Sequence, residues 1–246
     1  MLVEKGELTS GSTWHAAGLI PNFNPSLNVE RIHNERIKLY KELEAKYKST
    51  GWHGCGSLRL AVNKDEVDWF HYVQGIGKLV GFESHILSPA EIREVHPLLV
   101  ADDAIAGFYT PDDGHTDPTG TLNCLVTEAR EAGAQFVRHN RVLDISRMPS
   151  GEWQVTTEQG DIVCEHVVNA AGCYGPEVGA FTDLKVPIVN MVHQYLVTDN
   201  VAEVDGLTKE LPVVRDPYSS SYIRQEQRGI LIGPYETADS RAWALD

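Results

Sequence analysis

Residues 1–19 constrain the fold more than any other part of the chain. Met1-Leu2-Val3-Glu4 is typical of the end of a buried strand closed by an acid, and a loop of small residues follows at 9–13. A strand-end acid, a small-residue loop and a helix start together hold the ribose and pyrophosphate of a dinucleotide. Small residues let the backbone approach phosphate, and the first N–H groups of a helix face the anion. The run therefore predicts a dinucleotide-binding α/β fold with Glu4 as the ribose ligand.

His15 is unusual in such a loop, because an imidazole is bulky and nucleophilic. Residues 9–19 read Thr-Ser-Gly-Ser-Thr-Trp-His-Ala-Ala-Gly-Leu and resemble the flavin-attachment segment of the dimethylglycine and sarcosine dehydrogenase family. This resemblance implies FAD as the cofactor, bonded covalently through His15. Considered alone, His15 would be interpreted as a loop histidine satisfied by backbone groups. Further similar segments lie at 111–118, 168–172, 193–198 and 233–236.

The resemblance also implies a reaction. It is the oxidative N-demethylation of an amino acid of the dimethylglycine or sarcosine type, with hydride passing from the N-methyl group to flavin N5. Electron-transfer flavoprotein or oxygen would accept the electrons, and tetrahydrofolate could take the carbon on a further domain. Such a protein belongs to choline and glycine betaine catabolism and to one-carbon metabolism. A catalytically inactive regulatory relative and a noncovalent FAD oxidase of another secondary or tertiary amine stay open as alternatives.

By the same resemblance, the cofactor would contact four parts of the chain. Val142 would cover the adenine, although a core valine fits that position equally well. Ala171 and Gly172 would end a strand beside the pyrophosphate, and Gly233 would let the isoalloxazine approach; the alternatives are a packed strand end and a turn glycine. The remaining contacts lie in the attachment segment: Ser10, Gly11, Ser12, Thr13, His15, Ala16, Gly18 and Leu19.

His193 and Tyr222 match the substrate pocket of the family and are the predicted catalytic residues. A histidine whose pKa lies near the working pH could accept a proton or orient the amine. Arg215 and Arg224 are candidates for the substrate carboxylate, because a guanidinium matches that shape with two parallel hydrogen bonds. His115 is interpreted mainly as loop structure.

Composition excludes several other classes. With a net charge of −14 over 246 residues, nucleic acid and an anionic membrane surface are unsuitable partners. The four cysteines form no C-x-x-C pair, which favours reduced thiols. No metal motif, G-x-S-x-G, targeting segment or membrane-spanning run is present. These features predict a metal-free protein of the cytoplasm, or of the mitochondrial matrix in a eukaryote.

The predicted domain is a partial one. No G-x-G-x-x-G unit precedes Glu4, so the chain is expected to be an internal fragment that lacks this unit and the C-terminal folate domain. The predicted fold is a mixed α/β one in which a Rossmann-like FAD-binding domain is interleaved with an antiparallel-sheet substrate domain. FAD-binding pieces are placed at 1–49 and 105–180, and substrate-domain pieces at 50–104 and 181–235.

Periodicity and turn residues predict the elements. The helix over 27–47 is expected to bury a face with Val29, Ile32, Leu39, Tyr40, Leu43 and Tyr47. Other helices are predicted at 65–80, 89–94 and 119–132. Strands are predicted at 57–62, 104–110, 136–137, 142–148, 153–157, 162–164, 167–170, 194–198, 221–225 and 230–232.

Overall fold

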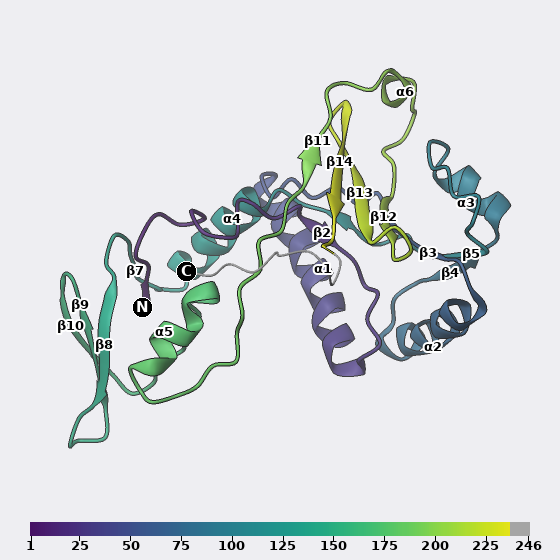
Figure 1. Cartoon of the computed structure of the whole chain (residues 1–246). Helices are drawn as coiled ribbons and strands as arrows, with labels where there is room; N and C mark the ends of the chain where they lie inside the picture. Colours follow the sequence, from purple (N-terminus) through teal and green to yellow (C-terminus); the bar gives the residue numbers. More distant parts are fainter. Residues whose placement is uncertain (237–246) are drawn as a thin grey trace. The chain divides into compact units, whose positions relative to one another are not determined.

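The computed structural model describes residues 1–236, which form two compact units (Figure 1). Within the described residues, the first unit comprises 1–14 and 127–192, and the second comprises 15–126 and 193–236. The helices are α1 Leu27–Tyr47, α2 Lys64–Val80, α3 Pro89–Val95, α4 Pro118–Glu131, η1 Gly172–Tyr174 (a 3₁₀ helix), α5 Gly175–Ala180 and α6 Ala202–Asp205. The strands are β1 Leu2–Val3, β2 Leu19–Ile20, β3 Ser57–Ala61, β4 His85–Leu87, β5 Ala106–Thr110, β6 Gly114–His115, β7 Phe136–Val137, β8 Val142–Arg147, β9 Trp153–Thr157, β10 Gly160–Cys164, β11 Leu196–Val197, β12 Val213–Asp216, β13 Ser221–Glu226 and β14 Gly229–Pro234.

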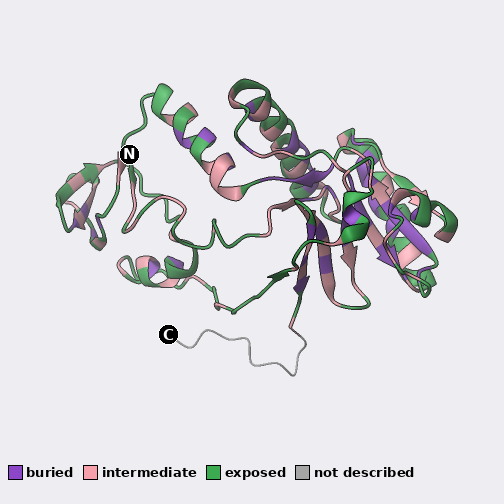
Figure 2. Cartoon of the chain, turned by 90° about the horizontal axis from the view of Figure 1, so that it is seen from above, coloured by how far each residue is buried: buried purple, intermediate pink, exposed green. Residues whose placement is uncertain are grey.

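A seven-stranded sheet organises the second unit, in the order β11-β14-β13-β12-β3-β5-β4. Only β12 and β3 run parallel, so the sheet is mixed as predicted. Strand alternation gives it two apolar faces. One face and α2 bury a cluster with Phe70, Val73 and Phe108, while Leu58, Ile92 and Val214 form a second cluster that includes α3. Figure 2 shows buried residues concentrated along these strands and on the inner sides of the helices.

Local signals in the sequence explain where α2 and α3 begin and end. The Asn63 side chain accepts the Glu66 N–H before α2, and Gly81 ends that helix with φ 92°. Ser88 and Glu91 form a reciprocal capping box at the start of α3, with Pro89 in the first turn. Both helices therefore lie where the sequence predicts them.

Helix α1 has the predicted bounds, but of the predicted buried face only Leu43 is buried. Its buried residues are Glu30, Asn34, Ile37 and Leu43, whereas Ile32 is 68% exposed. The helix packs on an interior that contains polar groups, since Asn22 and Asp113 are also fully buried. Polar side chains thus occupy inward positions, which an apolar periodicity cannot identify. Val29 and Leu39 are likewise exposed.

The first unit contains two small sheets. β1 pairs in parallel with β7, and β8, β9 and β10 form an antiparallel sheet in which Gly160 turns the hairpin at φ 122°. The prediction of a buried strand at the N-terminus is wrong in its burial, because Leu2 is 44% exposed. With a single neighbouring strand, β1 has little apolar surface to cover it.

Two further predictions are wrong. Residues 8–15 form successive turns with Thr9 at φ 72°, and no helix follows directly; β2 and then α1 come next. Residues 167–170 are not a strand, and Val168 is 85% exposed. No described strand pairs with them, and an extended segment without a ladder partner has no sheet hydrogen bonds to hold it. The predicted strand 194–198 shortens to β11 for the same reason, since only two of its residues pair with β14.

Candidate functional site

The second half of the attachment segment is fixed to the second unit by backbone contacts. The Ala17 carbonyl accepts a hydrogen bond from Arg224 Nε at 2.8 Å, and the Gly18 carbonyl accepts one from the Thr116 N–H at 3.0 Å. Leu19 then pairs with His115 between β2 and β6. Gly18 lies at φ 72°, and a Cβ there would be 2.1 Å from the Thr116 carbonyl oxygen. Glycine is therefore required at Gly18 by its own protein neighbour.

These contacts leave the start of that segment open. His15 and Ala16 are exposed, while Leu19 is half-buried. The exposed His15 thus directly precedes a stretch of backbone that is held at two carbonyls.

Glu4 and residues 10–13 belong to the first unit and form a compact turn. Glu4 is half-buried, and its Oε1 accepts the Gly6 N–H at 2.8 Å. Among residues 1–236, its second oxygen accepts no hydrogen bond. The Ser10 hydroxyl donates to the Glu7 carbonyl at 2.7 Å. Ser10, Gly11 and Ser12 are exposed, Thr13 is half-buried, and a Cβ on Gly11 would meet nothing within 4 Å.

The other candidates in this unit lie on β8 and before α5. Val142 is half-buried on β8, opposite Thr157. Gly172 adopts φ 58° with open space around it, and Ala171 precedes it as the residue before η1. Asn169 holds this turn, because its side chain accepts the Ala171 N–H at 3.2 Å and donates to the Gly175 carbonyl at 2.9 Å. An amide that bridges a turn in this way replaces the strand pairing that the sequence predicts.

His193 and Tyr222 come together in the second unit. Their ring centroids are 5.9 Å apart, and the His193 ring stacks on Tyr235 at 4.8 Å. His193 Nδ1 lies 3.1 Å from a carboxylate oxygen of Glu236, and the side chain of His193 is about one-third exposed. The hydrogen bond from His193 is the main cause that lowers the pKa of Glu236.

Arg215 completes this cluster from the adjacent strand. It pairs with Tyr222 across β12 and β13, donates a hydrogen bond to the Tyr235 hydroxyl, and lies 5.3 Å from the Tyr222 ring centroid. Burial is the main cause that raises the pKa of the Tyr222 phenol. We define His193, Arg215, Tyr222, Tyr235 and Glu236 as the sheet-face cluster.

The absence of a side chain at Gly233 leaves the space that the Tyr222 ring occupies. The two residues are opposite each other on β13 and β14, and a Cβ on Gly233 would lie 2.0 Å from Tyr222 Cζ. The space left by the missing side chain is thus filled by an aromatic ring of the protein. Contact of Gly233 with a flavin stays a prediction.

Substituting Gly233 with alanine should displace the Tyr222 ring and lower stability by about 1–3 kcal/mol, the usual cost of overpacking. Thermal or denaturant unfolding measures the change. Gly75→Ala is the matched control, because a Cβ there meets nothing within 4 Å and alanine is the better helix former. The double variant Gly233→Ala/Tyr222→Ala should lose little beyond Tyr222→Ala alone. If Gly233→Ala lowers stability equally in the wild type and in Tyr222→Ala, the Tyr222 ring is not the reason that glycine is needed at this position.

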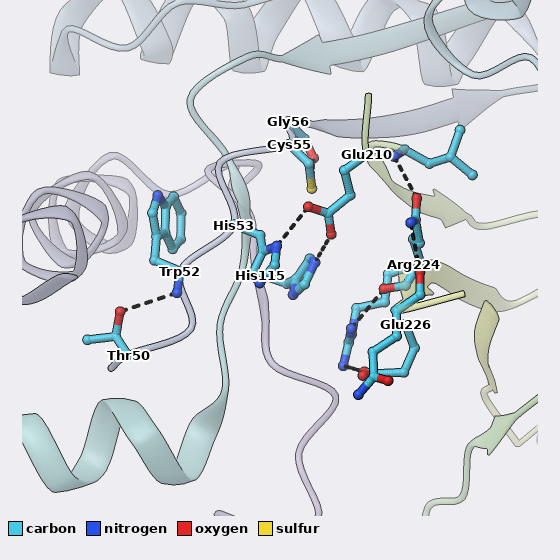
Figure 3. Close-up of polar contacts among 12 residues, drawn as sticks. Thr50, Trp52, His53, Cys55, Gly56, His115, Glu210, Arg224 and Glu226 are labelled. Atoms are coloured by element: carbon cyan, nitrogen blue, oxygen red, sulfur yellow. Dashed lines mark hydrogen bonds and ion pairs between the residues drawn. The ribbon is translucent and has the colours of Figure 1, made fainter. Parts of the chain in front are cut away.

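Each of the three guanidinium nitrogens of Arg224 has a partner within the protein. Besides Ala17, its guanidinium donates to the Gln225 carbonyl at 2.9 Å and pairs with Glu226 at 2.5 Å. Its side chain is buried at 9% exposure. Figure 3 shows this ion pair beside a second polar group. The geometry favours Arg215 over Arg224 as the residue available to a substrate carboxylate, and gives Arg224 the role of holding the attachment segment.

The second polar group is formed by His53, His115 and Glu210 (Figure 3). One Glu210 oxygen lies 2.7 Å from His53 Nδ1 and the other 2.6 Å from His115 Nε2, while the two imidazoles stack at 4.6 Å. Gly114 permits this approach, since a Cβ there would lie 1.8 Å from the His53 carbonyl oxygen. With Arg224 and Glu226, these three residues line a cavity of about 330 Å³.

This His-Glu-His group could in principle hold a metal, because its three donor atoms lie within 4.8 Å of one another and suit Zn²⁺. However, both imidazole nitrogens are already within hydrogen-bond distance of the carboxylate. Burial raises the pKa of Glu210, but hydrogen bonds from His115 and His53 outweigh it, so that the pKa is lowered overall. We interpret the group as a hydrogen-bonded cluster that joins the segments around 53, 115 and 210.

Sequence reasoning missed four residues of these two groups: Tyr235, Glu236, His53 and Glu210. Tyr235 and Glu236 directly follow β14, so their place beside Tyr222 could have been found from the hairpin register. His53 and His115 are 62 residues apart in the sequence, and His115 and Glu210 are 95 apart, so no local pattern brings the three together.

Over residues 1–236, no helix has the length and apolar character needed to cross a membrane.

Comparisons with known proteins place the chain in a family. A family model described as FAD dependent oxidoreductase matches residues 1–245. The chain is 43% identical over 240 residues to dimethylglycine dehydrogenase, mitochondrial, of Rattus norvegicus, which is 97% of this chain and 28% of that protein. Identity to sarcosine dehydrogenase, mitochondrial, of Homo sapiens is 37% over 246 residues, which is 96% of this chain and 26% of that protein. The crystal structure of L-proline dehydrogenase from P. horikoshii superimposes with a TM-score of 0.85 at 26% identity, over 97% of this chain and 64% of that one.

Proposed function

Because the chain belongs to the FAD-dependent oxidoreductase family, we propose that the protein containing it oxidises an N-methylated amino acid of the dimethylglycine or sarcosine type. The resemblance predicted from residues 9–19 is confirmed by the match to both dehydrogenases. The chain spans about a quarter of the length of these relatives, at 28% and 26%. The observation that carries the proposal is the sheet-face cluster, which brings a histidine beside a neutral phenol and a cation of one sheet.

The residues present fit FAD in their chemistry. Glu4 has a carboxylate oxygen without a protein donor within the described chain, which suits a ribose hydroxyl. Residues 10–13 and Gly172 offer exposed backbone without bulky side chains, which suits a pyrophosphate. His15 is an exposed residue, and its imidazole would supply the nitrogen for a covalent bond to the flavin. When bound, FAD would supply the acceptor for the hydride of the N-methyl carbon.

His193 would receive the proton of the substrate ammonium. Loss of hydride from carbon leaves a cation, so the amine must first be neutral. If His193 Nδ1 carries the proton that Glu236 accepts, Nε2 of the neutral ring is free of hydrogen and can act as the base. Glu236 thus positions the ring and selects its tautomer.

Tyr222 would donate its hydroxyl to the substrate. Burial keeps the pKa of this phenol above its ordinary value, so the hydroxyl stays protonated at neutral pH. Arg215 would face the carboxylate. The product imine is hydrolysed by water, giving the demethylated amine and an aldehyde.

Several finer points belong to the same proposal. The electron acceptor is electron-transfer flavoprotein or oxygen, and tetrahydrofolate takes the carbon if a folate domain is present. In a eukaryote we place the protein in the mitochondrial matrix, because the names of both relatives carry that organelle.

The test is substrate oxidation by the protein that contains this chain. We expect dimethylglycine or sarcosine to bleach the flavin absorbance and release formaldehyde. His193→Gln should lower kcat/KM by roughly 10²–10⁴-fold, the usual contribution of a general base. The exposed His71 provides the control, since His71→Gln should leave the rate unchanged. Bound flavin that no amine reduces would favour the regulatory relative, and turnover of unrelated amines alone would favour an oxidase of another specificity.

A further inference from the structure

A second guanidinium lies beside Arg215. Arg59 on β3 pairs in register with Arg215 on β12, and these two strands run parallel. Paired residues on neighbouring strands point to the same face of a sheet and are about 4.8 Å apart. Arg215 in turn pairs with Tyr222 on the next strand. The row Arg59, Arg215, Tyr222 therefore crosses three strands on the face that carries the sheet-face cluster.

Both guanidiniums are surrounded by aromatic rings. The Arg59 Cζ lies 4.7 Å from the Phe23 ring centroid and 5.3 Å from that of Trp69. The corresponding distances for Arg215 are 5.3 Å to Tyr222 and 5.2 Å to Tyr235. Rings beside a guanidinium orient it without using its N–H groups, although one N–H of Arg215 already donates to the Tyr235 hydroxyl.

Neither cation is neutralised within the chain that the structure describes. Over residues 1–236, no carboxylate forms an ion pair with Arg59 or Arg215 within the 4.0 Å limit, although both side chains are half-buried. Glu66, which affects Arg59 electrostatically, uses its Oε2 to accept the Val62 N–H at 2.7 Å. Burial first, and then the charge of Arg215, lower the pKa of Arg59. Two adjacent cations repel each other, and partial burial removes some of their hydration. A bound carboxylate would offset both the repulsion and the lost hydration.

We infer that Arg59 and Arg215 together form the subsite for the carboxylate of an amino acid substrate. Arg224 is excluded from this role because Ala17, Gln225 and Glu226 already engage its guanidinium. Figure 3 shows its contact with Glu226. The inference deepens the proposed function and rests on it for the identity of the substrate. It adds Arg59 as a residue that determines specificity. A carboxylate bound by Arg59 and Arg215 would place the amine of the substrate beside Tyr222 and His193. Amines without a carboxylate would lose both charged contacts.

The experiment compares dimethylglycine with N,N-dimethylaminoethanol, in which a hydroxymethyl group replaces the carboxylate. Arg59→Gln should raise KM for dimethylglycine by about 10–100-fold, the worth of a charged hydrogen bond, and change kcat less. The same substitution should leave the weak turnover of the alcohol nearly unchanged. Arg59→Lys should recover part of the affinity, because it keeps the charge but loses the planar fork. Arg147→Gln is the matched control, since Arg147 also stacks on a tryptophan, at 5.8 Å from Trp153, in the first unit.

A binding measurement separates this inference from the proposed function. Acetate is titrated into the same proteins by calorimetry, and an unchanged midpoint of thermal unfolding confirms that each variant is folded. Acetate binding that is weakened at least tenfold by Arg59→Gln and not by Arg147→Gln would support the subsite even if no N-methyl amine were oxidised. Equal acetate affinity in wild type and Arg59→Gln would overturn the subsite, whatever the enzyme oxidises. If Arg59→Gln is unfolded, Arg59→Lys decides: unchanged affinity for both acetate and dimethylglycine contradicts a bidentate role.

Discussion

Substitution of His15 by alanine is expected to move all of the flavin from the protein into the supernatant after acid precipitation. A covalent bond needs a ring nitrogen, and alanine offers none. His15 is exposed, and the following carbonyls of Ala17 and Gly18 are held by Arg224 and Thr116. An accessible imidazole on an anchored backbone would be suited to hold the flavin through one of its methyl carbons. The measurement is the yellow absorbance of pellet and supernatant, together with the mass of the intact protein.

The control is His166→Ala, which removes an equally exposed imidazole of the first unit. It should keep the flavin in the pellet and the added mass of one FAD. Flavin in the supernatant of the wild-type protein would refute the covalent bond while leaving the fold intact. Arg224→Lys offers a finer comparison, because it should reduce the attached fraction without changing His15 itself.

Local signals explain which elements could be predicted. The caps at Asn63 and Ser88, the glycines at 81 and 160, and the apolar spacing of α2 are all set by residues a few positions apart. Such interactions are complete within one segment, so the sequence determines them. The mixed sheet was expected from the interleaving of nucleotide-binding segments with segments rich in antiparallel strand signals. The short strand β12, at the centre of that sheet, was missed because its two consecutive valines are both buried and the strand shows no alternation.

Tertiary contacts explain the errors and omissions. Residues 167–170 have the composition of a buried strand, yet Asn169 bonds its own turn and no described strand pairs with them. In α1 the inward positions hold Glu30 and Asn34, because the interior that the helix meets is itself polar. At the candidate site, a family motif pointed to His193 and Tyr222, but only register across β3 and β12 reveals Arg59. Segment-level similarity finds the residues of a site, and strand pairing finds their neighbours.

The free energy of unfolding is expected to fall as the pH rises from about 5 to 8, and Glu30 is the main cause. Glu30 is fully buried, and neither carboxylate oxygen has a hydrogen-bond partner within residues 1–236. Burial, and secondarily Asp113, raise its pKa to about 8 from the ordinary 4.5. Burial likewise raises the pKa of Asp113 to about 7, against hydrogen bonds from Ser57 and Asn22.

The sign follows from proton binding in the two states. Below pH 4.5 both states hold the Glu30 proton, so the raised pKa has no effect on stability there. At higher pH the unfolded chain releases this proton while the folded protein retains it, so each such group lowers the unfolding free energy by roughly 1.4 kcal/mol per pH unit. The decline for Glu30 ends near pH 8, where the folded carboxyl ionises too.

Glu30→Gln tests this dependence, because glutamine keeps the shape and cannot ionise. The midpoint of thermal unfolding, measured from pH 5 to 8, should fall less steeply in this variant than in the wild type, so the difference between them grows with pH. Glu35→Gln is the control on the same helix, since Glu35 is exposed and pairs with Lys38 at 2.6 Å; its profile should parallel the wild type. Asp113 keeps its own slope in both variants, so a residual decline is expected up to about pH 7. If Glu30→Gln also parallels the wild type, Glu30 must already be ionised inside the fold, and its two oxygens would need donors from bound water.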